Sequence, residues 1–207
     1  MQTRWFLLGM GALVVVALFA FPLWWPVVNR SPVSNALPGL SDLPLDEQEV
    51  IGQIALENMA FAEALIAAGL EEPSVVPLVD QALPLMQGAS SYAVGEFSAI
   101  DAVRQAEGTV TVYEVIGEGG QNSYVVRLED FAVRNGPELH VFLSAHPQPR
   151  TPEELRANGL GIDLGPLKGT VGSQNYQVSG GFAMSEAQSI VIYSNPYQEV
   201  FSSAQLF

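Results

Sequence analysis

The chain has 207 residues and carries 22 acidic against 8 basic side chains, for a net charge of −14. Sequence-independent binding to nucleic acid is therefore excluded, because it depends on basic side chains that neutralise phosphates. The chain has no cysteine, which excludes a disulfide scaffold, Cys-ligated zinc, an iron–sulfur cluster and a thiol nucleophile. Its two histidines, His140 and His146, are too few for a three-histidine metal site.

Residues 5–25 form an uncharged apolar run that begins with Trp5 and ends with Trp24 and Trp25. A helix of this length spans roughly 30 Å at about 1.5 Å per residue, which matches the hydrocarbon layer of a membrane. Tryptophan rings prefer the headgroup level at either face. We expect a membrane anchor over residues 1–30, with the lipid bilayer as partner and the rest of the chain outside the cytoplasm. A cleaved signal peptide is the alternative, although no A-x-A site follows the run.

Residues 31–90 hold nine acidic and no basic side chains, and they open with a stretch rich in Pro and Ser. This composition indicates an acidic linker. Within it, apolar residues recur at helical spacing and predict one amphipathic helix over about residues 47–68. We expect its apolar stripe to pack on the following domain or on a second copy of the chain. Docking of a partner protein is the alternative.

Residues 91–207 have the pattern of an all-β domain, because short segments rich in Val, Tyr, Phe and Thr alternate with Gly, Pro, Asn and Asp. The predicted strands are Gly108–Ile116, Ser123–Asp130, Leu139–Ala145, Asn175–Val178, Gln188–Tyr193 and Val200–Leu206. Residues 119–122 (Gly-Gly-Gln-Asn) predict a hairpin between the first two strands. Thr151 predicts the N-cap of one short helix over Pro152–Asn158. Six or more strands in a domain of this size predict a β-sandwich or a small barrel.

Several blocks of this domain match a known family in order and spacing. They are Arg127–Phe131, Asn135–Ser144, Leu164–Tyr176, Ile190–Tyr193 and Val200–Leu206. On these blocks, residues 95–206 resemble the DM-thirteen domain, which occurs in secreted and membrane-attached proteins and in animals often stands beside DOMON domains. The resemblance implies the fold, an extracytoplasmic setting and a proposed role in electron transfer at cell surfaces.

The electron transfer proposed for that family rests on a nearly invariant cysteine after the strand that matches Ile190–Tyr193. Ser194 stands at that position in this sequence. An alcohol does not cycle through a disulfide and is a poor ligand for soft metals or haem iron. Arg104 stands where the family commonly has a histidine. The fold and the setting are therefore carried over, whereas thiol redox chemistry is not.

The candidate binding residues are polar or turn-forming groups of the matching blocks. They are Asn135, Gly136, Pro137, His140, Lys168, Gln174, Asn175, Tyr176 and Ser194. Residues 135–137 form either a ligand-facing loop or a plain turn in which glycine supplies a positive φ and proline a fixed φ. Residues 174–176 either bind a ligand or satisfy buried backbone groups. Lys168, the only lysine of the chain, binds an acidic ligand or pairs with a carboxylate of the domain.

The remaining candidates have plain structural interpretations as well. His140 and His146 would lie about 20 Å apart on one straight strand, too far to chelate one ion. His140 then is a strand-face imidazole and His146 a loop imidazole. Ser194 lacks the G-x-S-x-G context of a hydrolase nucleophile. We expect no catalytic residue, no metal and no cofactor.

These observations favour a non-enzymatic binding module at the cell envelope, with an envelope protein or a small ligand as partner. A binding module predicts a concave patch lined by residues 135–137 and 174–176. The alternative is an electron-transfer accessory protein that uses a bound cofactor or a partner in place of the missing cysteine.

Overall fold

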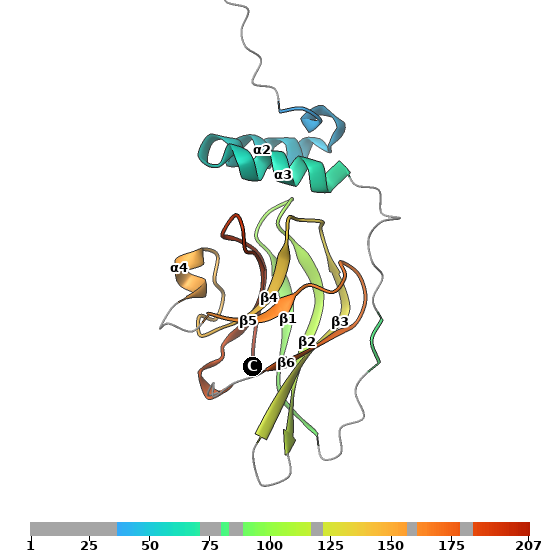
Figure 1. The fold of residues 1–207 in the computed structure, drawn as a ribbon, viewed down its shortest axis with the longest axis vertical. Coiled ribbons are helices and arrows are strands. Elements are labelled where there is room, and N and C mark those ends of the chain that lie inside the picture. The colour runs from blue at the N-terminus through green and yellow to red at the C-terminus, as the bar shows by residue number, and fades with distance from the viewer. Residues whose placement is uncertain (1–36, 71–79, 83–88, 117–121, 157–160, 179–183) are drawn as a thin grey trace, which may run out of the picture. The chain divides into compact units, whose positions relative to one another are not determined.

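The computed structural model describes residues 37–70, 80–82, 89–116, 122–156, 161–178 and 184–207. Residues 38–207 form one compact unit (Figure 1). The predicted membrane anchor, residues 5–25, lies outside the described residues. Within the described part of the chain, no helix is long and apolar enough to cross a membrane.

The β domain is one antiparallel sheet of eight strands (Figure 1). They are β1 (Ser90–Ala99), β2 (Ala106–Ile116), β3 (Asn122–Val133), β4 (Leu139–Ser144), β5 (Gly161–Pro166), β6 (Gln174–Val178), β7 (Ser189–Ser194) and β8 (Glu199–Gln205). The strands are hydrogen-bonded in the order β5-β4-β7-β8-β1-β2-β3-β6. The two end strands, β5 and β6, come into contact. The sheet is thus a nearly closed barrel, which confirms the all-β prediction and selects the barrel over the sandwich.

The six predicted strands are present as β2, β3, β4, β6, β7 and β8, with small shifts of their ends. β2 and β3 pair antiparallel, as the predicted hairpin requires, and Asn122, a predicted turn residue, instead begins β3 and pairs with Ile116. Residues 119–121 of the predicted turn lie outside the described residues. The sequence prediction misses β1 and β5. β1 buries only Ala93 and Phe97, and β5 buries none of its residues. Neither strand therefore shows the alternation of apolar and polar residues by which a half-buried strand is recognised.

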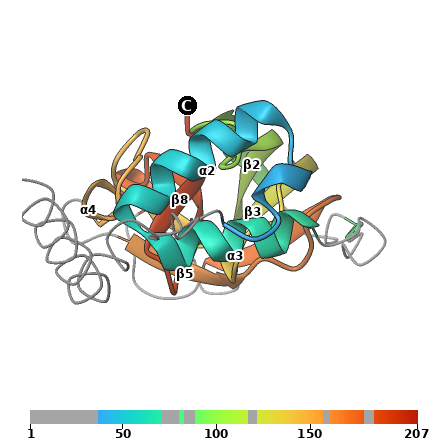
Figure 2. The same cartoon turned by 90° about the horizontal axis from the view of Figure 1, so that it is seen from above.

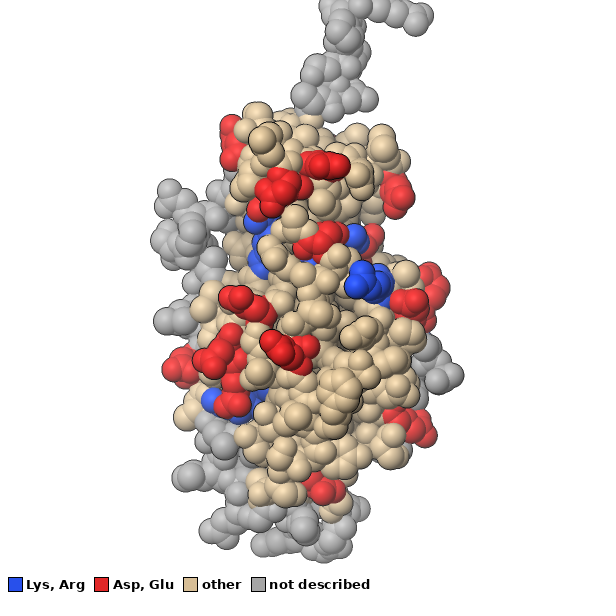
Figure 3. All heavy atoms as spheres, turned by 180° about the vertical axis from the view of Figure 1, so that it is seen from behind, with Lys and Arg blue, Asp and Glu red and all other residues tan. Residues whose placement is uncertain are grey.

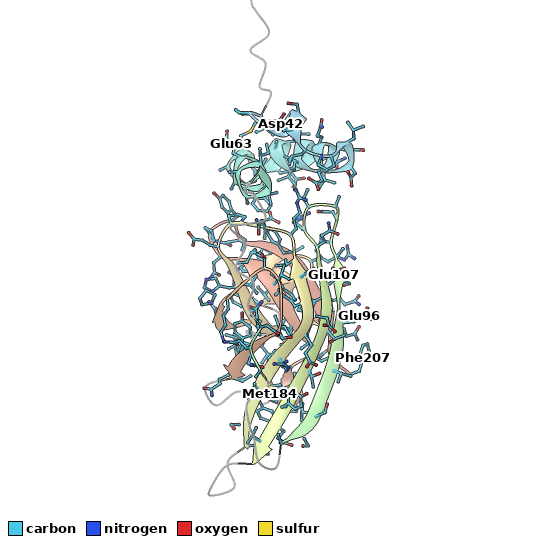
Figure 4. All side chains as sticks on the ribbon, turned by 90° about the vertical axis from the view of Figure 1, so that its right-hand side faces the viewer. Asp42, Glu63, Glu96, Glu107, Met184 and Phe207 are labelled. Carbon is cyan, nitrogen blue, oxygen red and sulfur yellow. The ribbon has the colours of Figure 1, made fainter. Side chains whose placement is uncertain are left out.

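The buried side chains of the β domain are mostly apolar, with several serines, Gln174 and Arg127 among them, and acidic side chains project from the sheet. All six residues of β7 are buried, as expected for a strand that is covered on both faces. The ring of Tyr193 on β7 lies 5.2 Å from that of Phe142 on β4. In contrast, Glu96 and Glu107 are exposed and project from the outside of the sheet (Figure 4).

The short helix α4 (Pro152–Leu155) covers one side of this core with Leu155, which is fully buried. The hydroxyl oxygen of Thr151 accepts a hydrogen bond from the backbone N–H of Glu154 at 3.2 Å. This contact confirms the predicted N-cap. The described helix ends before Asn158, the predicted end.

The predicted helix over residues 47–68 is two helices, α2 (Leu45–Glu57) and α3 (Met59–Leu70), which lie side by side (Figure 2). Asn58 separates them with a non-helical backbone, φ −145° and ψ 87°. Its side-chain oxygen accepts a hydrogen bond from the N–H of Phe61 at 3.1 Å, as an N-cap asparagine does. The apolar spacing continues across Asn58 and therefore did not show the break.

The helix pair packs on one end of the barrel (Figure 1). Phe61 is fully buried, with its ring 5.3 Å from that of Tyr197 and 6.2 Å from that of Phe201. The carboxylate of Glu47, only 6% exposed, accepts two hydrogen bonds from the guanidinium of Arg134, at 2.5 and 2.6 Å. The apolar stripe of the helices thus packs on the β domain of the same chain, which was one of the predicted alternatives.

Candidate functional site

An open groove follows the seam where the two end strands of the barrel meet. Its volume is about 860 Å³. One wall comes from β5 and the loop that follows it, and the other comes from β6 with its neighbours β3 and β2. Residues of the lining include Gln81, Leu164, Pro166, Lys168, Asn175 and Tyr176. The groove exists because β5 and β6 contact each other without forming a ladder of hydrogen bonds.

Two side chains of β6 fix the loop that bears Lys168. Gln174 is fully buried, and its side-chain oxygen accepts hydrogen bonds from the backbone N–H of Lys168 at 3.1 Å and from the hydroxyl of Tyr176 at 2.8 Å. Its amide nitrogen donates to the carbonyl of Gly169 at 2.6 Å. Burial raises the pKa of Tyr176 to about 12, so the phenol keeps the proton that it donates. Gln174 and Tyr176 thus satisfy backbone groups and position the lysine.

The ammonium of Lys168 lies at the rim of the groove among neutral groups. It donates to the carbonyl oxygen of Asn175 and to the side-chain oxygen of Gln81, the latter at 3.2 Å. It lies 4.7 Å from the centre of the Tyr176 ring. Among the described residues, no carboxylate lies within ion-pair distance of this ammonium. Desolvation lowers the pKa of Lys168 from its ordinary value.

Three arginines of the described residues, Arg104, Arg127 and Arg134, have carboxylate partners, whereas the guanidinium of Arg156 has the hydroxyl of Tyr193 at 3.3 Å. Arg104 pairs with Asp101 and Glu199, both at 2.7 Å. Arg127 pairs with Glu129 at 2.7 Å. In Figure 3, the basic side chains on the visible face likewise lie beside acidic ones. Lys168 differs from Arg104, Arg127 and Arg134 in having only neutral partners, and it differs from Arg156 in lining the groove.

The block of residues 135–137 does not line the groove. Gly136 lacks the positive φ that we predicted, and the turn instead has its positive φ at Glu138, with φ 45°. Glycine is required at residue 136 for another reason, since a Cβ there would overlap the ring of Phe201. Of the expected patch, the groove lining therefore contains Asn175 and Tyr176 but not residues 135–137.

The remaining candidates also lie apart from the groove lining. The hydroxyl of Ser194, at the end of β7, is fully buried and donates to the carbonyl of Pro137 at 2.6 Å. His140 places its Nδ1 2.9 Å from the carboxylate of Asp163. The Nδ1 of His146 accepts a hydrogen bond from the N–H of Gln148 at 3.2 Å. The described residues contain no group of three or more side chains that could ligate one metal ion.

Two residues were not predicted from the sequence: Gln81, which lines the groove, and Arg127, which contacts Gln81. Gln81 belongs to the acidic linker, where no motif marks it, and only the folded chain brings it to Lys168. Arg127 occurs within a block that matches the DM-thirteen domain, but the block does not show that its guanidinium reaches the carbonyl of Gln81 at 2.9 Å. In the sequence, Arg127 is a polar residue between Val126 and Leu128, which indicates only that it lies on a strand.

Comparison with protein families identifies the β domain. A family model described as electron transfer DM13 matches residues 97–206, which is more than half of the chain. The chain belongs to the DM13 family. No curated protein and no solved structure matches it. The DM13 match begins inside β1 and ends just after β8, so α2, α3 and residues 80–82 lie outside it.

The position of the DM13 cysteine does not fit a redox group in this chain. Ser194 stands there, and the chain has no cysteine elsewhere. A buried alcohol whose proton is donated to a main-chain carbonyl neither forms a disulfide nor fits as a ligand for a soft metal or haem iron. Arg104, at the place of the family histidine, is occupied by its two carboxylate partners. Neither position offers the donor atom that the family's proposed chemistry needs.

Proposed function

We propose that this DM13 domain is a non-enzymatic binding module that takes an anionic ligand in the groove at the seam of the barrel. The observation that supports this function is Lys168, whose exposed ammonium has neutral partners in a chain of net charge −14. An ammonium has three protons to donate. Among the described residues, two of them are used by Asn175 and Gln81, which leaves one for a ligand at the groove. A carboxylate there would form a charge-assisted hydrogen bond.

We place the module at a membrane surface, with the barrel outside the cytoplasm. The support is the uncharged run of residues 5–25, which has the length and the tryptophan ends of a membrane anchor. The acidic surface of the chain is unsuited to lying flat on anionic lipid, so the apolar run would be the means of attachment.

Electron transfer is the second candidate, because it is the activity in the description of the family. The buried Ser194 favours binding over electron transfer, since any redox role of this chain would need a cofactor held elsewhere or a partner protein. The absorption spectrum of the full-length protein, purified from its own membrane, separates the two. A visible band at near-stoichiometric occupancy would support electron transfer, whereas absorption by tyrosine and tryptophan alone supports the binding module.

The binding function is tested by titrating the full-length protein in detergent with succinate, and with neutral succinamide as a matched ligand, at constant ionic strength. Amide NMR shifts of Asn175 and Tyr176 report on the groove. We expect saturable shifts with succinate and none with succinamide. The Lys168→Gln variant should lose the response. The Arg150→Gln variant, which removes an equal charge from an exposed residue outside the groove lining, should keep it.

Two results would contradict the binding function. The first is a wild-type protein whose groove resonances do not respond to succinate. The second is a Lys168→Gln variant that binds succinate as tightly as the wild type.

A further inference from the structure

Residues 80–82 lie along the free edge of β6, although Asn175 on that strand follows Gln81 by 94 positions. They are the short green stretch within the grey trace on the right of Figure 1. β6 is hydrogen-bonded to β3 on one side only. Its other edge therefore presents main-chain donors and acceptors that an extended segment can satisfy.

Three hydrogen bonds hold the main chain of this segment. The N–H of Gln81 donates to the carbonyl of Ser173 at 2.8 Å. The guanidinium of Arg127 donates to the carbonyl of Gln81 at 2.9 Å. The side-chain amide of Asn175 donates to the carbonyl of Ala82 at 3.0 Å. Because all three bonds use backbone atoms of residues 80–82, any extended polypeptide could form them.

The side chain of Gln81 adds contacts that depend on its chemistry. Its oxygen Oε1 accepts hydrogen bonds from the backbone N–H of Asn175 at 2.9 Å and from the ammonium of Lys168 at 3.2 Å. A glutamate at this place would offer a carboxylate oxygen to the same two donors. The bond from the N–H of Asn175 would then be charge-assisted, and the bond from the ammonium of Lys168 would join two opposite charges, so both would be stronger than bonds to a neutral amide. Gln81, the residue that the chain itself places at this edge, therefore binds more weakly than a glutamate would.

We propose that the free edge of β6 is a recognition site for an extended acidic segment of a partner protein, which places a glutamate where Gln81 now lies. Residues 80–82 are the tethered occupant that the partner segment displaces. This inference rests on the proposed function, because Lys168 supplies the cation. Residues 80–82 of a second copy would bring the same neutral glutamine and gain nothing over the tethered segment, so the proposed occupant is a segment of a different polypeptide.

The tether determines how the site should respond to mutation. A segment of the same chain competes at a high effective concentration, which lowers the apparent affinity for a peptide in solution. Truncating Gln81 weakens the competitor and should strengthen binding of the peptide. Replacing Gln81 with glutamate strengthens the competitor and should weaken binding of the peptide.

The test uses two blocked tripeptides: acetyl-Asp-Gln-Ala-amide, which has the sequence of residues 80–82, and acetyl-Asp-Glu-Ala-amide, in which glutamate replaces the glutamine. Affinities are measured by amide NMR for the full-length wild type, Gln81→Ala and Gln81→Glu. The control is Gln53→Ala, which truncates an exposed glutamine on α2. We expect the Glu peptide to bind about fivefold more tightly than the Gln peptide, as for a partly exposed charge pair. Affinity for the Glu peptide should rise in Gln81→Ala, fall in Gln81→Glu and stay unchanged in the control.

Equal affinities of the two peptides would overturn the glutamate preference. Equal affinities of the wild type, Gln81→Ala and Gln81→Glu for the Glu peptide would overturn displacement of residues 80–82. The succinate titration separates this failure from failure of the proposed function. If succinate binds at Lys168 and neither peptide binds to any variant, the edge site is refuted and the anion groove stands. If succinate and the peptides all fail to bind, both proposals are refuted.

Discussion

The Phe61→Ala variant tests whether the helix pair is an integral part of the domain although it lies outside the DM13 match. Phe61 is fully buried against Tyr197 and Phe201. Truncating a fully buried phenylalanine removes its transfer free energy and leaves a cavity, which together cost about 3–5 kcal/mol. For a domain of this size, each kcal/mol lowers Tm by about 2–4 °C. We therefore expect Tm to fall by roughly 6–20 °C.

The assay is thermal unfolding of the full-length protein, followed by circular dichroism and, in parallel, by hydrogen exchange of the β8 amides. Leu56→Ala is the control, because Leu56 lies on α2 and is 88% exposed. Its effect should stay within about 0.5 kcal/mol. The reasoning would be refuted if Phe61→Ala changed Tm no more than Leu56→Ala does. Loss of helix signal with unchanged protection of β8 would refute it as well.

Three further predictions concern single positions. The Ser194→Cys variant should resist a soluble thiol reagent until the protein unfolds, because residue 194 is fully buried; rapid labelling of the folded protein would contradict this. Gly136→Ala should destabilise the protein by about 1–3 kcal/mol through overlap with Phe201, whereas Gly52→Ala, whose Cβ meets nothing within 4 Å, should not; equal Tm values would contradict the close approach. Succinate affinity should fall as pH rises through the pKa of Lys168, below the ordinary 10.5, since only the ammonium attracts an anion; constant affinity up to pH 10.5 would contradict this.

The sequence predicted those strands and helices in which the apolar residues are the buried ones and the polar residues are exposed. β2 buries Val110 and Val112 and leaves alternate residues more exposed, which is the pattern that identified it. β5 is an end strand without a buried residue, so its place in the barrel depends on pairing with β4 rather than on its own pattern. Asn58 ends one helix and caps the next inside an unbroken apolar pattern.

The candidate site was predicted in part for a similar reason. Lys168, Asn175 and Tyr176 lie within one block of the sequence, and the fold keeps them together. Gln81 could not be predicted, because its contact with Asn175 spans 94 positions and no feature of the linker indicates it. Residues 135–137 were expected at the same patch on the strength of their turn chemistry, yet that turn is occupied by contacts with Phe201 and Ser194.

One measurement tests the central claim most directly, namely that Lys168 is the cation of an anion-binding groove. Lys168 is the only lysine of the chain, so selective lysine labelling of the full-length protein gives one side-chain NMR signal. Its pH titration follows a single ammonium. We predict a midpoint below 10.5 without ligand, because desolvation disfavours the charged form. Succinate should move the midpoint upward, because a bound carboxylate favours the ammonium. A midpoint that succinate does not move would contradict the account.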